Sequence, residues 1–232
     1  MKKFSIIFFC ILCMFLLISC KEEPRHTPYI TEKQDSIVKT SLGEEYFLDK
    51  RNGSMYPLIK IGEQIWFSKN LEIKTPNSYC PEDDETVCSF YGRLYEWNDA
   101  VTACPNGWKL PTKQDFEKLI SNVKHICHES DDSKIGTLLK SRIAWDMDEK
   151  IAQGTPSGID CVRFSALPAG RRKDSGFTTI EGANKMRNYA AFWTSDEDGF
   201  GAAHYSLYNY KEEFAFGNSD KKYALSVRCL KE

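Results

Sequence analysis

The 232-residue chain lacks an excess of charge of either sign, because 31 lysines and arginines are balanced by 33 aspartates and glutamates. This balance excludes the strongly basic surface of a typical nucleic-acid-binding protein, so we expect no nucleic acid as a partner. The chain also lacks a bilayer-spanning helix near its start, because the apolar stretch from Phe4 to Ile18 falls short of the roughly 20 residues required.

Motifs of common enzyme classes are missing as well. The sequence contains no Gly-x-Ser-x-Gly nucleophile motif, no phosphate-binding loop and no His-Glu-x-x-His zinc motif. Internal repeats and low-complexity tracts are also absent. We therefore expect a protein that is not an enzyme and that needs no cofactor.

The composition indicates one folded domain, or at most two small ones. Hydrophobic residues make up 41% and aromatic residues 13% of the chain, which is too rich for a disordered protein. The nine cysteines are many for a cytosolic protein of this size, and their number is odd.

The N-terminus resembles a bacterial lipoprotein signal. Lys2 and Lys3 precede the apolar stretch, which ends in the lipobox-like Leu17-Ile18-Ser19-Cys20. This pattern predicts a signal peptide over residues 1–19 and an N-terminal lipid on Cys20 that anchors the protein to a membrane. Lys21-Glu22-Glu23 then resembles the export signal of surface lipoproteins in Bacteroidota. We expect a lipid-anchored protein of the outer membrane, displayed at the cell surface.

Processing at this site accounts for three of the nine cysteines. Cys10 and Cys13 are removed with the signal peptide, and Cys20 is acylated. An even number remains, which in an exported protein predicts a disulfide framework. The six are Cys80, Cys88, Cys104, Cys127, Cys161 and Cys229. Residues 20–42 are polar and contain two prolines, so they predict a flexible tether, and residues 43–232 predict a single domain.

The order of predicted elements indicates an α+β fold with an antiparallel sheet. Helical spacing predicts a helix over residues 91–103, and Thr112 with Asp115 predicts a capping box at the start of another helix. A short helix is expected over residues 133–141. Residues 142–190 read as mostly irregular. Strands are expected at residues 44–49, 55–61, 64–68, 164–167, 191–194, 203–210, 213–216 and 223–230.

Three stretches together resemble the Fibrobacter succinogenes major paralogous domain, a family common among lipoproteins of Bacteroidota. They extend from about residue 50 to residue 230, with the motifs in the family's order. The first is Gly62-Glu63-Gln64-Ile65-Trp66 with Lys69-Asn70-Leu71, and the second is Tyr91-Gly92-Arg93-Leu94-Tyr95-Glu96-Trp97 with Ala103 to Thr112. The third is Phe164-Ser165-Ala166-Leu167-Pro168-Ala169-Gly170, Phe192-Trp193-Thr194-Ser195 and Ser226-Val227-Arg228-Cys229.

The resemblance implies a C-type lectin-like fold with two main helices and a long irregular loop region. In such folds the cysteine of the first helix bridges to the last strand, which implies a Cys104–Cys229 disulfide. Cys80 and Cys88 are close enough in sequence to close a local loop. Cys127 and Cys161 are left to each other, although six cysteines allow 15 pairing schemes.

Two groups of residues offer metal ligands, but we expect no metal site at either. His125, Cys127 and His128 offer zinc ligands, but Cys127 has an expected disulfide partner. The acidic turn 196–198 offers carboxylates to calcium, but a surface turn is the simpler interpretation. The Glu-Pro-Asn and Gln-Pro-Asp motifs of calcium-dependent lectins are absent, and Trp97-Asn98-Asp99 lies in the wrong part of the fold. Enzymes related to this fold work through reactive cysteines, whereas here all six can pair.

Aromatic and cationic side chains give the candidate ligand-binding residues. Trp66, Trp97 and Trp108 stand in periodic or motif positions and are assigned to the core. The candidates are Trp145, Arg171, Arg172, Tyr208 and Tyr210, whose rings stack on sugars and whose guanidinium groups hydrogen-bond to hydroxyls or carboxylates; partial burial against neighbouring loops is the alternative. We expect a non-catalytic surface module that binds a glycan or a protein, or alternatively a structural or assembly component of a cell-envelope complex.

Overall fold

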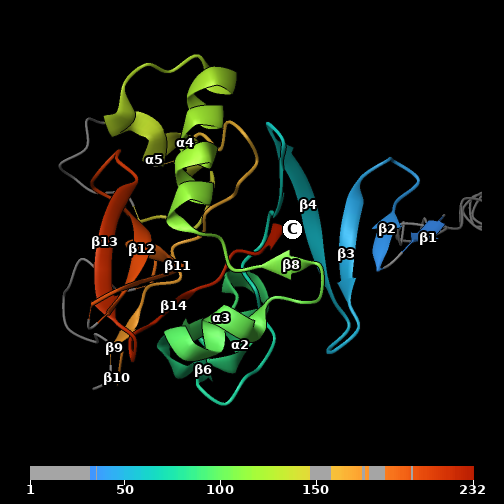
Figure 1. Ribbon diagram of the computed structural model, residues 1–232, viewed down its shortest axis with the longest axis horizontal. Helices are drawn as coiled ribbons and strands as arrows, with labels where there is room; N and C mark the ends of the chain where they lie inside the picture. The colour runs from blue at the N-terminus through green and yellow to red at the C-terminus, as the bar shows by residue number, and fades with distance from the viewer. Residues whose placement is uncertain (1–31, 35, 147–157, 174–175, 178–185, 200) are drawn as a thin grey trace, which may run out of the picture.

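The computed structural model describes residues 32–34, 36–146, 158–173, 176–177, 186–199 and 201–232 (Figure 1). The predicted signal peptide, Cys20 and the Lys21-Glu22-Glu23 signal lie outside these residues. Two sheets, paired mostly antiparallel, and four α-helices confirm the predicted α+β class. Across the described ranges, no helix combines the length and the apolar character needed to cross a membrane.

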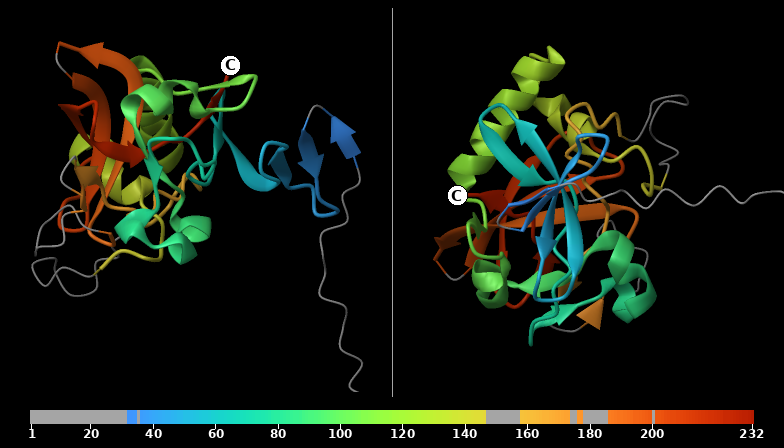
Figure 2. Two further views of the ribbon diagram at one scale, coloured as in Figure 1. Left: turned by 90° about the horizontal axis from the view of Figure 1, so that it is seen from below. Right: turned by 90° about the vertical axis from the view of Figure 1, so that its right-hand side faces the viewer.

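The first sheet has seven strands and extends away from the body of the molecule at its N-terminal edge (Figure 2). Its order is β1 (Glu32–Gln34), β2 (Ile37–Lys39), β3 (Glu45–Asp49), β4 (Ser54–Ile61), β5 (Gln64–Phe67), β15 (Leu230–Lys231) and β8 (Trp108–Lys109). The strands predicted at 44–49, 55–61 and 64–68 are confirmed. Strands β1 and β2 fall in the segment predicted as tether, and Val38 is buried, so regular structure begins before residue 43.

The second sheet carries the candidate site. Its main path is β10 (Gly176–Phe177), β9 (Arg172–Lys173), β14 (Ala224–Ser226), β11 (Tyr189–Asp198), β12 (Gly201–Tyr208) and β13 (Ala215–Asp220), and β6 (Ser78–Tyr79) and β7 (Leu94–Glu96) join it beside β14. β11 pairs antiparallel with β12 and parallel with β14. The strand predicted over 164–167 is wrong, because Ala166 forms only a single bridge, to Lys140.

Four helices pack on the sheets: α2 (Glu85–Tyr91), α3 (Trp97–Ala103), α4 (Lys113–Cys127) and α5 (Ile135–Leu139). Two short 3₁₀ helices span Pro81–Asp83 and Asp132–Lys134. The predicted capping box is present, because Thr112 Oγ1 accepts from the Asp115 amide at 3.0 Å and Asp115 Oδ2 accepts from the Thr112 amide at 2.9 Å. The helix predicted over 91–103 is shorter, because its first part forms β7, which pairs with β14.

The C-terminal segment links the two sheets. It runs from β14 in the second sheet to β15 in the first, and Cys229 lies between the two strands. Three disulfides match the predicted pairs: Cys80–Cys88, Cys104–Cys229 and Cys127–Cys161. The Cys104–Cys229 bridge therefore ties the end of α3 to the place where the chain crosses between sheets.

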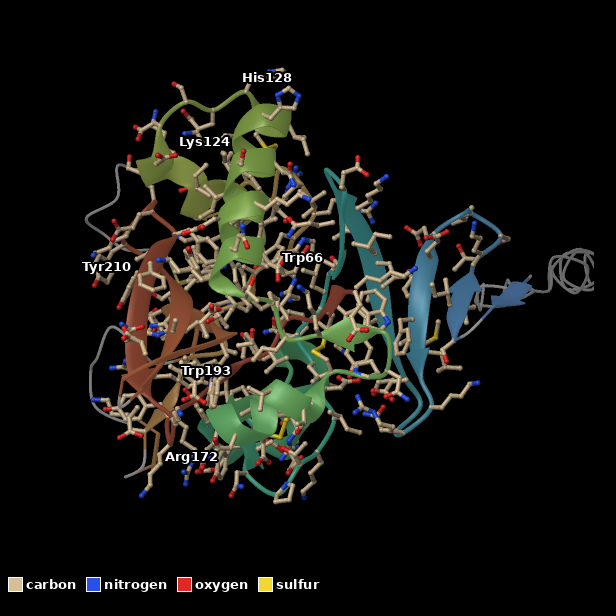
Figure 3. All side chains as sticks on the ribbon, viewed as in Figure 1. Trp66, Lys124, His128, Arg172, Trp193 and Tyr210 are labelled. Carbon is tan, nitrogen blue, oxygen red and sulfur yellow. A yellow bond between two sulfur atoms is a disulfide. The ribbon has the colours of Figure 1, made fainter. Side chains whose placement is uncertain are left out.

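Two apolar clusters form most of the core. One lies between the second sheet and helices α4 and α5, where Phe116 of α4 packs against Tyr205. The other lies between the two sheets and contains Trp193 (Figure 3). Trp66, Trp97 and Trp108 are buried as predicted.

The motif stretches meet at one buried side chain, Arg228. Its guanidinium donates to Asn70 Oδ1 at 2.6 Å, to the Phe67 carbonyl at 3.2 Å and to the Phe164 carbonyl. Asn70 in turn donates to the Tyr91 carbonyl at 2.8 Å. These contacts join residues from all three stretches, so this part of the motif holds the fold together and does not form an exposed site.

Gly92 is required beside this cluster. Its φ of +76° and ψ of −178° fall in a region that is nearly exclusive to glycine. A Cβ at this position would lie 2.5 Å from Cβ of Asn70 and 2.9 Å from the Leu71 carbonyl oxygen.

We expect Gly92→Ala to lower the free energy of unfolding by about 1–3 kcal/mol from backbone strain, with the steric clash adding to it. Urea denaturation followed by tryptophan fluorescence measures the change. Gly107→Ala is the matched control, because Gly107 also has positive φ but a Cβ there meets nothing within 4 Å. An equal loss in both variants would show that the close contact with Asn70 is unimportant.

Candidate functional site

The register of the second sheet places a set of polar and aromatic residues on one face. Tyr189 pairs with Tyr208, Trp193 with His204, and His204 with Gly217. Residues directly opposite each other, and residues two apart on one strand, share a face. This face of β11, β12 and β13 is therefore the one opposite to the face that packs on α4. On β13 it carries only small residues, Ala215, Gly217 and Ser219.

Three tyrosines form a continuous row at one end of this face. The ring centroids of Tyr189 and Tyr208 lie 4.9 Å apart, and those of Tyr208 and Tyr210 lie 5.3 Å apart. Exposure increases along the row, from buried Tyr189 to Tyr210, which is 39% exposed. Lys211 Nζ lies 5.3 Å from the Tyr208 ring centroid. The row ends in solvent, where a flat apolar ligand surface can stack on it.

A buried lysine, Lys140, supports the turn that carries Tyr210 from the interior of the protein. Lys140 is 1% exposed, and its Nζ donates to the Lys211 carbonyl at 2.5 Å. The amine also lies 5.2 Å from the Trp145 ring centroid. Burial lowers the pKa of Lys140 to about 8. This anchoring gives the outer tyrosine a rigid support.

Arg171 lies at the other end of the tyrosine row. Its guanidinium carbon is 5.6 Å from the Tyr189 ring centroid and 5.5 Å from that of Tyr223. Among the described residues no carboxylate forms an ion pair with it, and its buried Nε has no acceptor. Arg171 is therefore a cation held between aromatic rings, with no acidic partner in the described part of the chain.

His204 occupies the same face and is 6% exposed. Its Nδ1 atom is buried and has no hydrogen-bond partner within the described part of the chain. Burial, and secondarily the charge of Arg171, lower the pKa of His204 to about 4. The imidazole is consequently neutral at pH 7.

This lowered pKa predicts a loss of stability in mild acid. The unfolded chain binds a proton on His204 near pH 6.5, whereas the folded protein does so only near pH 4, so stability falls as the pH drops between these values. We expect the parent protein to lose about 2–3 kcal/mol more than His204→Gln between pH 7 and pH 4.5. Urea denaturation at both pH values measures the difference. Parallel losses in the two proteins would contradict the prediction.

The structure brings Arg171, Tyr208 and Tyr210 together through Tyr189 but separates the other two predicted site residues from them. Arg172 follows Arg171 as the first residue of β9, and its side chain contacts a different ring. Its guanidinium carbon lies 4.0 Å from the Tyr79 ring centroid, well away from Tyr210 in Figure 3. The alternative of burial holds for Trp145, which is 6% exposed, so it has no free ring face for a sugar.

The residues that offer metal ligands make other interactions in the structure. Cys127 is bonded to Cys161 and offers no thiolate to zinc. Asp196 accepts from the Lys113 amide at 2.6 Å, and Glu197 pairs with Lys221 at 2.8 Å, so these carboxylates serve different partners. The described residues also group Cys80, Glu85 and Cys88 at metal-binding distance, but both thiols are in a disulfide.

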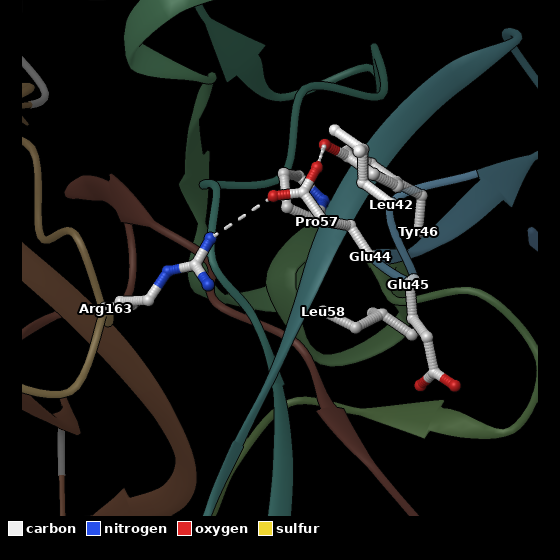
Figure 4. A pocket seen from close by; sticks show the side chains of 8 residues that line it. Leu42, Glu44, Glu45, Tyr46, Pro57, Leu58 and Arg163 are labelled. Carbon is white, nitrogen blue, oxygen red and sulfur yellow. Dashed lines mark hydrogen bonds and ion pairs between the residues drawn. The ribbon is translucent and has the colours of Figure 1, made fainter. Parts of the chain in front are cut away.

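Two of the surface hollows that the described residues line lie away from the tyrosine row. One of about 300 Å³ lies where β3 and β4 face Arg163 (Figure 4). Its charges are satisfied internally, because Glu44 pairs with Arg163 at 3.8 Å and accepts from Tyr46 at 3.1 Å. The other, of about 490 Å³, lies beside Cys104 and the Asp49–Arg51 ion pair. Neither hollow offers a free cation next to exposed aromatic rings.

Three residues of the site were not among the predicted ones: Tyr189, His204 and Tyr223. Strand alternation places His204 on the same face as Tyr208, but the register between β11 and β12 has no sequence signal. Tyr223 lies outside the strands and reaches the site only through the fold. The partner of Arg171 could therefore not be found without the structure.

Comparison with known proteins gives a family but no characterised relative. A family model described as the Fibrobacter succinogenes major domain matches residues 59–231. No curated protein and no solved structure matches the chain. The matched range contains the Arg228 cluster and every residue of the candidate site, and it leaves out β1 to β3.

Proposed function

The chain belongs to the Fibrobacter succinogenes major domain family, and we propose that it is a non-catalytic binding module for a glycan or protein ligand, displayed on the cell surface by an N-terminal lipid. The observation that carries this proposal is the row from Arg171 through Tyr189 and Tyr208 to exposed Tyr210. Exposed aromatic rings beside hydrogen-bond donors are typical of ligand surfaces that combine an apolar body with polar groups.

The proposal includes a C-type lectin-like fold. The support is the order of elements: α3 ends at Cys104, the longer helix α4 follows, and the final segment carries Cys229, which bridges back to Cys104. Fold-level analogy of this kind carries no information about the ligand. The absence of an enzymatic role is supported by the cysteines, since all six in the predicted mature domain form disulfides and offer no nucleophilic thiolate.

A ligand array tests the binding role. The mature chain, produced without lipid from residue 21 onward, is applied to glycan and protein arrays with and without calcium. We expect binding that does not require calcium and that is lost in the double variant Tyr208→Ala/Tyr210→Ala. Phe90→Ala is a matched control, because Phe90 is another exposed ring, on α2.

The arrays also distinguish the binding role from the alternative role as a structural or assembly component of a cell-envelope complex. A protein that binds nothing on the arrays but co-purifies with envelope proteins is a structural or assembly component, and the binding role is then rejected. Retained binding in the variant Tyr208→Ala/Tyr210→Ala would show that the ligand binds at a place other than the tyrosine row.

Display at the cell surface is tested on whole cells. Replacing Lys21-Glu22-Glu23 with alanines should protect the protein from added protease while leaving it membrane-bound. Cys20→Ala should release it from the membrane, because the acylated residue is lost. Unchanged protease accessibility in the first variant would contradict the export signal.

A further inference from the structure

The candidate site has an electrostatic imbalance that a ligand can remove. Arg171 is a permanent cation, and its buried Nε has no acceptor among the described residues. Two carboxylates of the described part of this sheet and its turns have other partners: Glu213 pairs with Lys211 at 2.9 Å, and Glu197 pairs with Lys221 at 2.8 Å. A partly buried cation with no counter-charge among the residues that the structure describes is costly, so the site favours an anion.

A second observation points to the same place. His204 is more than nine-tenths buried, lies on the face that Arg171 covers, and leaves its Nδ1 atom without a partner in the described structure. Trp193 lies edge-on to its ring, with centroids 6.0 Å apart, and Gly217 of β13 lies against the imidazole. Since Gly217 has no side chain, the imidazole of His204 lies directly over the backbone of β13, where a Cβ would be 3.2 Å from His204 Cε1.

The neighbouring rings set the rest of the ligand chemistry. Tyr189 links Arg171 to Tyr208, and Tyr208 contacts Tyr210. A ligand whose anionic group pairs with Arg171 would therefore reach a surface of stacking rings within a few ring widths of that group. A planar guanidinium matches a carboxylate through two parallel hydrogen bonds.

We propose that this site binds an acidic glycan, in which the carboxylate of a uronic acid pairs with Arg171 while an adjoining sugar ring stacks on Tyr208 and Tyr210. This inference rests on the proposed binding function and narrows its ligand to carboxylate-bearing sugars.

The test compares trigalacturonate with galactotriose, its neutral counterpart, by calorimetric titration of the mature chain. We expect trigalacturonate to bind about ten-fold or more tightly than galactotriose, because a charge-assisted hydrogen bond is lost with the carboxylate. Arg171→Met should abolish this preference. Arg172→Met is the matched control and should keep it, because the Arg172 side chain contacts Tyr79.

A spectroscopic signal at His204 separates ligand pairing from a structural role of Arg171. The charge of Arg171 contributes to the low pKa of His204, so an anion bound at Arg171 should raise that pKa, as followed by the imidazole proton shift in NMR. Galactotriose should leave it unchanged. In Arg171→Met without ligand the pKa should rise for the same reason, and trigalacturonate should then add no further shift.

The outcomes separate this inference from the proposed function. Equal affinity for the two trisaccharides would overturn the acidic-glycan assignment while leaving a glycan-binding module. Preference for a sulfated trisaccharide over trigalacturonate, or preference retained in Arg171→Met, would also overturn it. If neither trisaccharide binds, the inference is rejected, and the arrays then decide separately whether the protein is a binding module.

Discussion

Replacing Arg228 with methionine is expected to lower the free energy of unfolding by about 3–5 kcal/mol. The guanidinium is fully buried and donates to the side chain of Asn70 and to the carbonyls of Phe67 and Phe164. Methionine has no donors, so these buried oxygens would lose their partners, and each such loss costs about 1–3 kcal/mol. Urea denaturation at pH 7 measures the change.

Two further variants test whether the lost hydrogen bonds of Arg228 cause the destabilisation. Arg228→Lys keeps a charge but loses the planar fork, and it should also be strongly destabilised because one amine cannot reach all the acceptors. Arg163→Met removes an arginine whose side chain is 73% exposed, and it should cost less than about 1 kcal/mol. If Arg228→Met is as stable as Arg163→Met, the buried cluster does not hold the motif stretches together.

Removal of the Cys104–Cys229 disulfide is expected to have an effect of similar size. The bridge closes a loop with a sequence separation of 125 residues, so its loss should cost about 4–5 kcal/mol in the chain-entropy model. The comparison is the double alanine variant at Cys80 and Cys88, whose separation is 8 residues and for which about 2–3 kcal/mol is expected. Denaturation of both variants in urea under oxidising conditions shows which disulfide contributes more to the free energy of unfolding.

The location of the long-range bridge adds to its effect. Cys229 is fully buried where the chain passes from β14 to β15, and its carbonyl accepts from the Phe67 amide at 3.0 Å. Without the bridge, α3 loses its covalent link to the junction of the two sheets. Equal destabilisation in the two double variants would mean that loop length does not govern the contribution of these bridges.

Local chemistry explains which parts of the fold were predictable from sequence. The capping box of Thr112 and Asp115, and the turns at Gly53 and Gly62 with positive φ, depend on neighbouring residues only. The segment 94–96 was assigned to a helix because its apolar spacing is compatible with one, yet it forms β7 through pairing with β14 and β6. Pairing between segments distant in sequence is not encoded in periodicity.

The candidate site depends even more on contacts between segments that are distant in sequence, which the sequence pattern does not encode. Both Arg171 and Arg172 are candidates from the sequence, and only the structure shows that Arg171 contacts Tyr189 and Tyr223, whereas Arg172 contacts Tyr79. The buried state of Trp145 follows from its tertiary surroundings, since its Nε1 donates to the Ala166 carbonyl at 3.1 Å. Residue type alone could not distinguish this tryptophan from an exposed one.

The antiparallel N-terminal strands also determine how the protein would respond to a pulling force. A load applied through the residues before Glu32 reaches the outermost pair first, where Glu32 lies opposite Lys39. Such a load opens the ladder one residue pair at a time, because the open end of the hairpin faces the pull. Strands β1 and β2 would therefore peel away at low force and lengthen the linker. The disulfide-linked body that holds Arg171 and the tyrosine row would stay folded. The short ladder would therefore unfold first and protect the rest of the domain from the load.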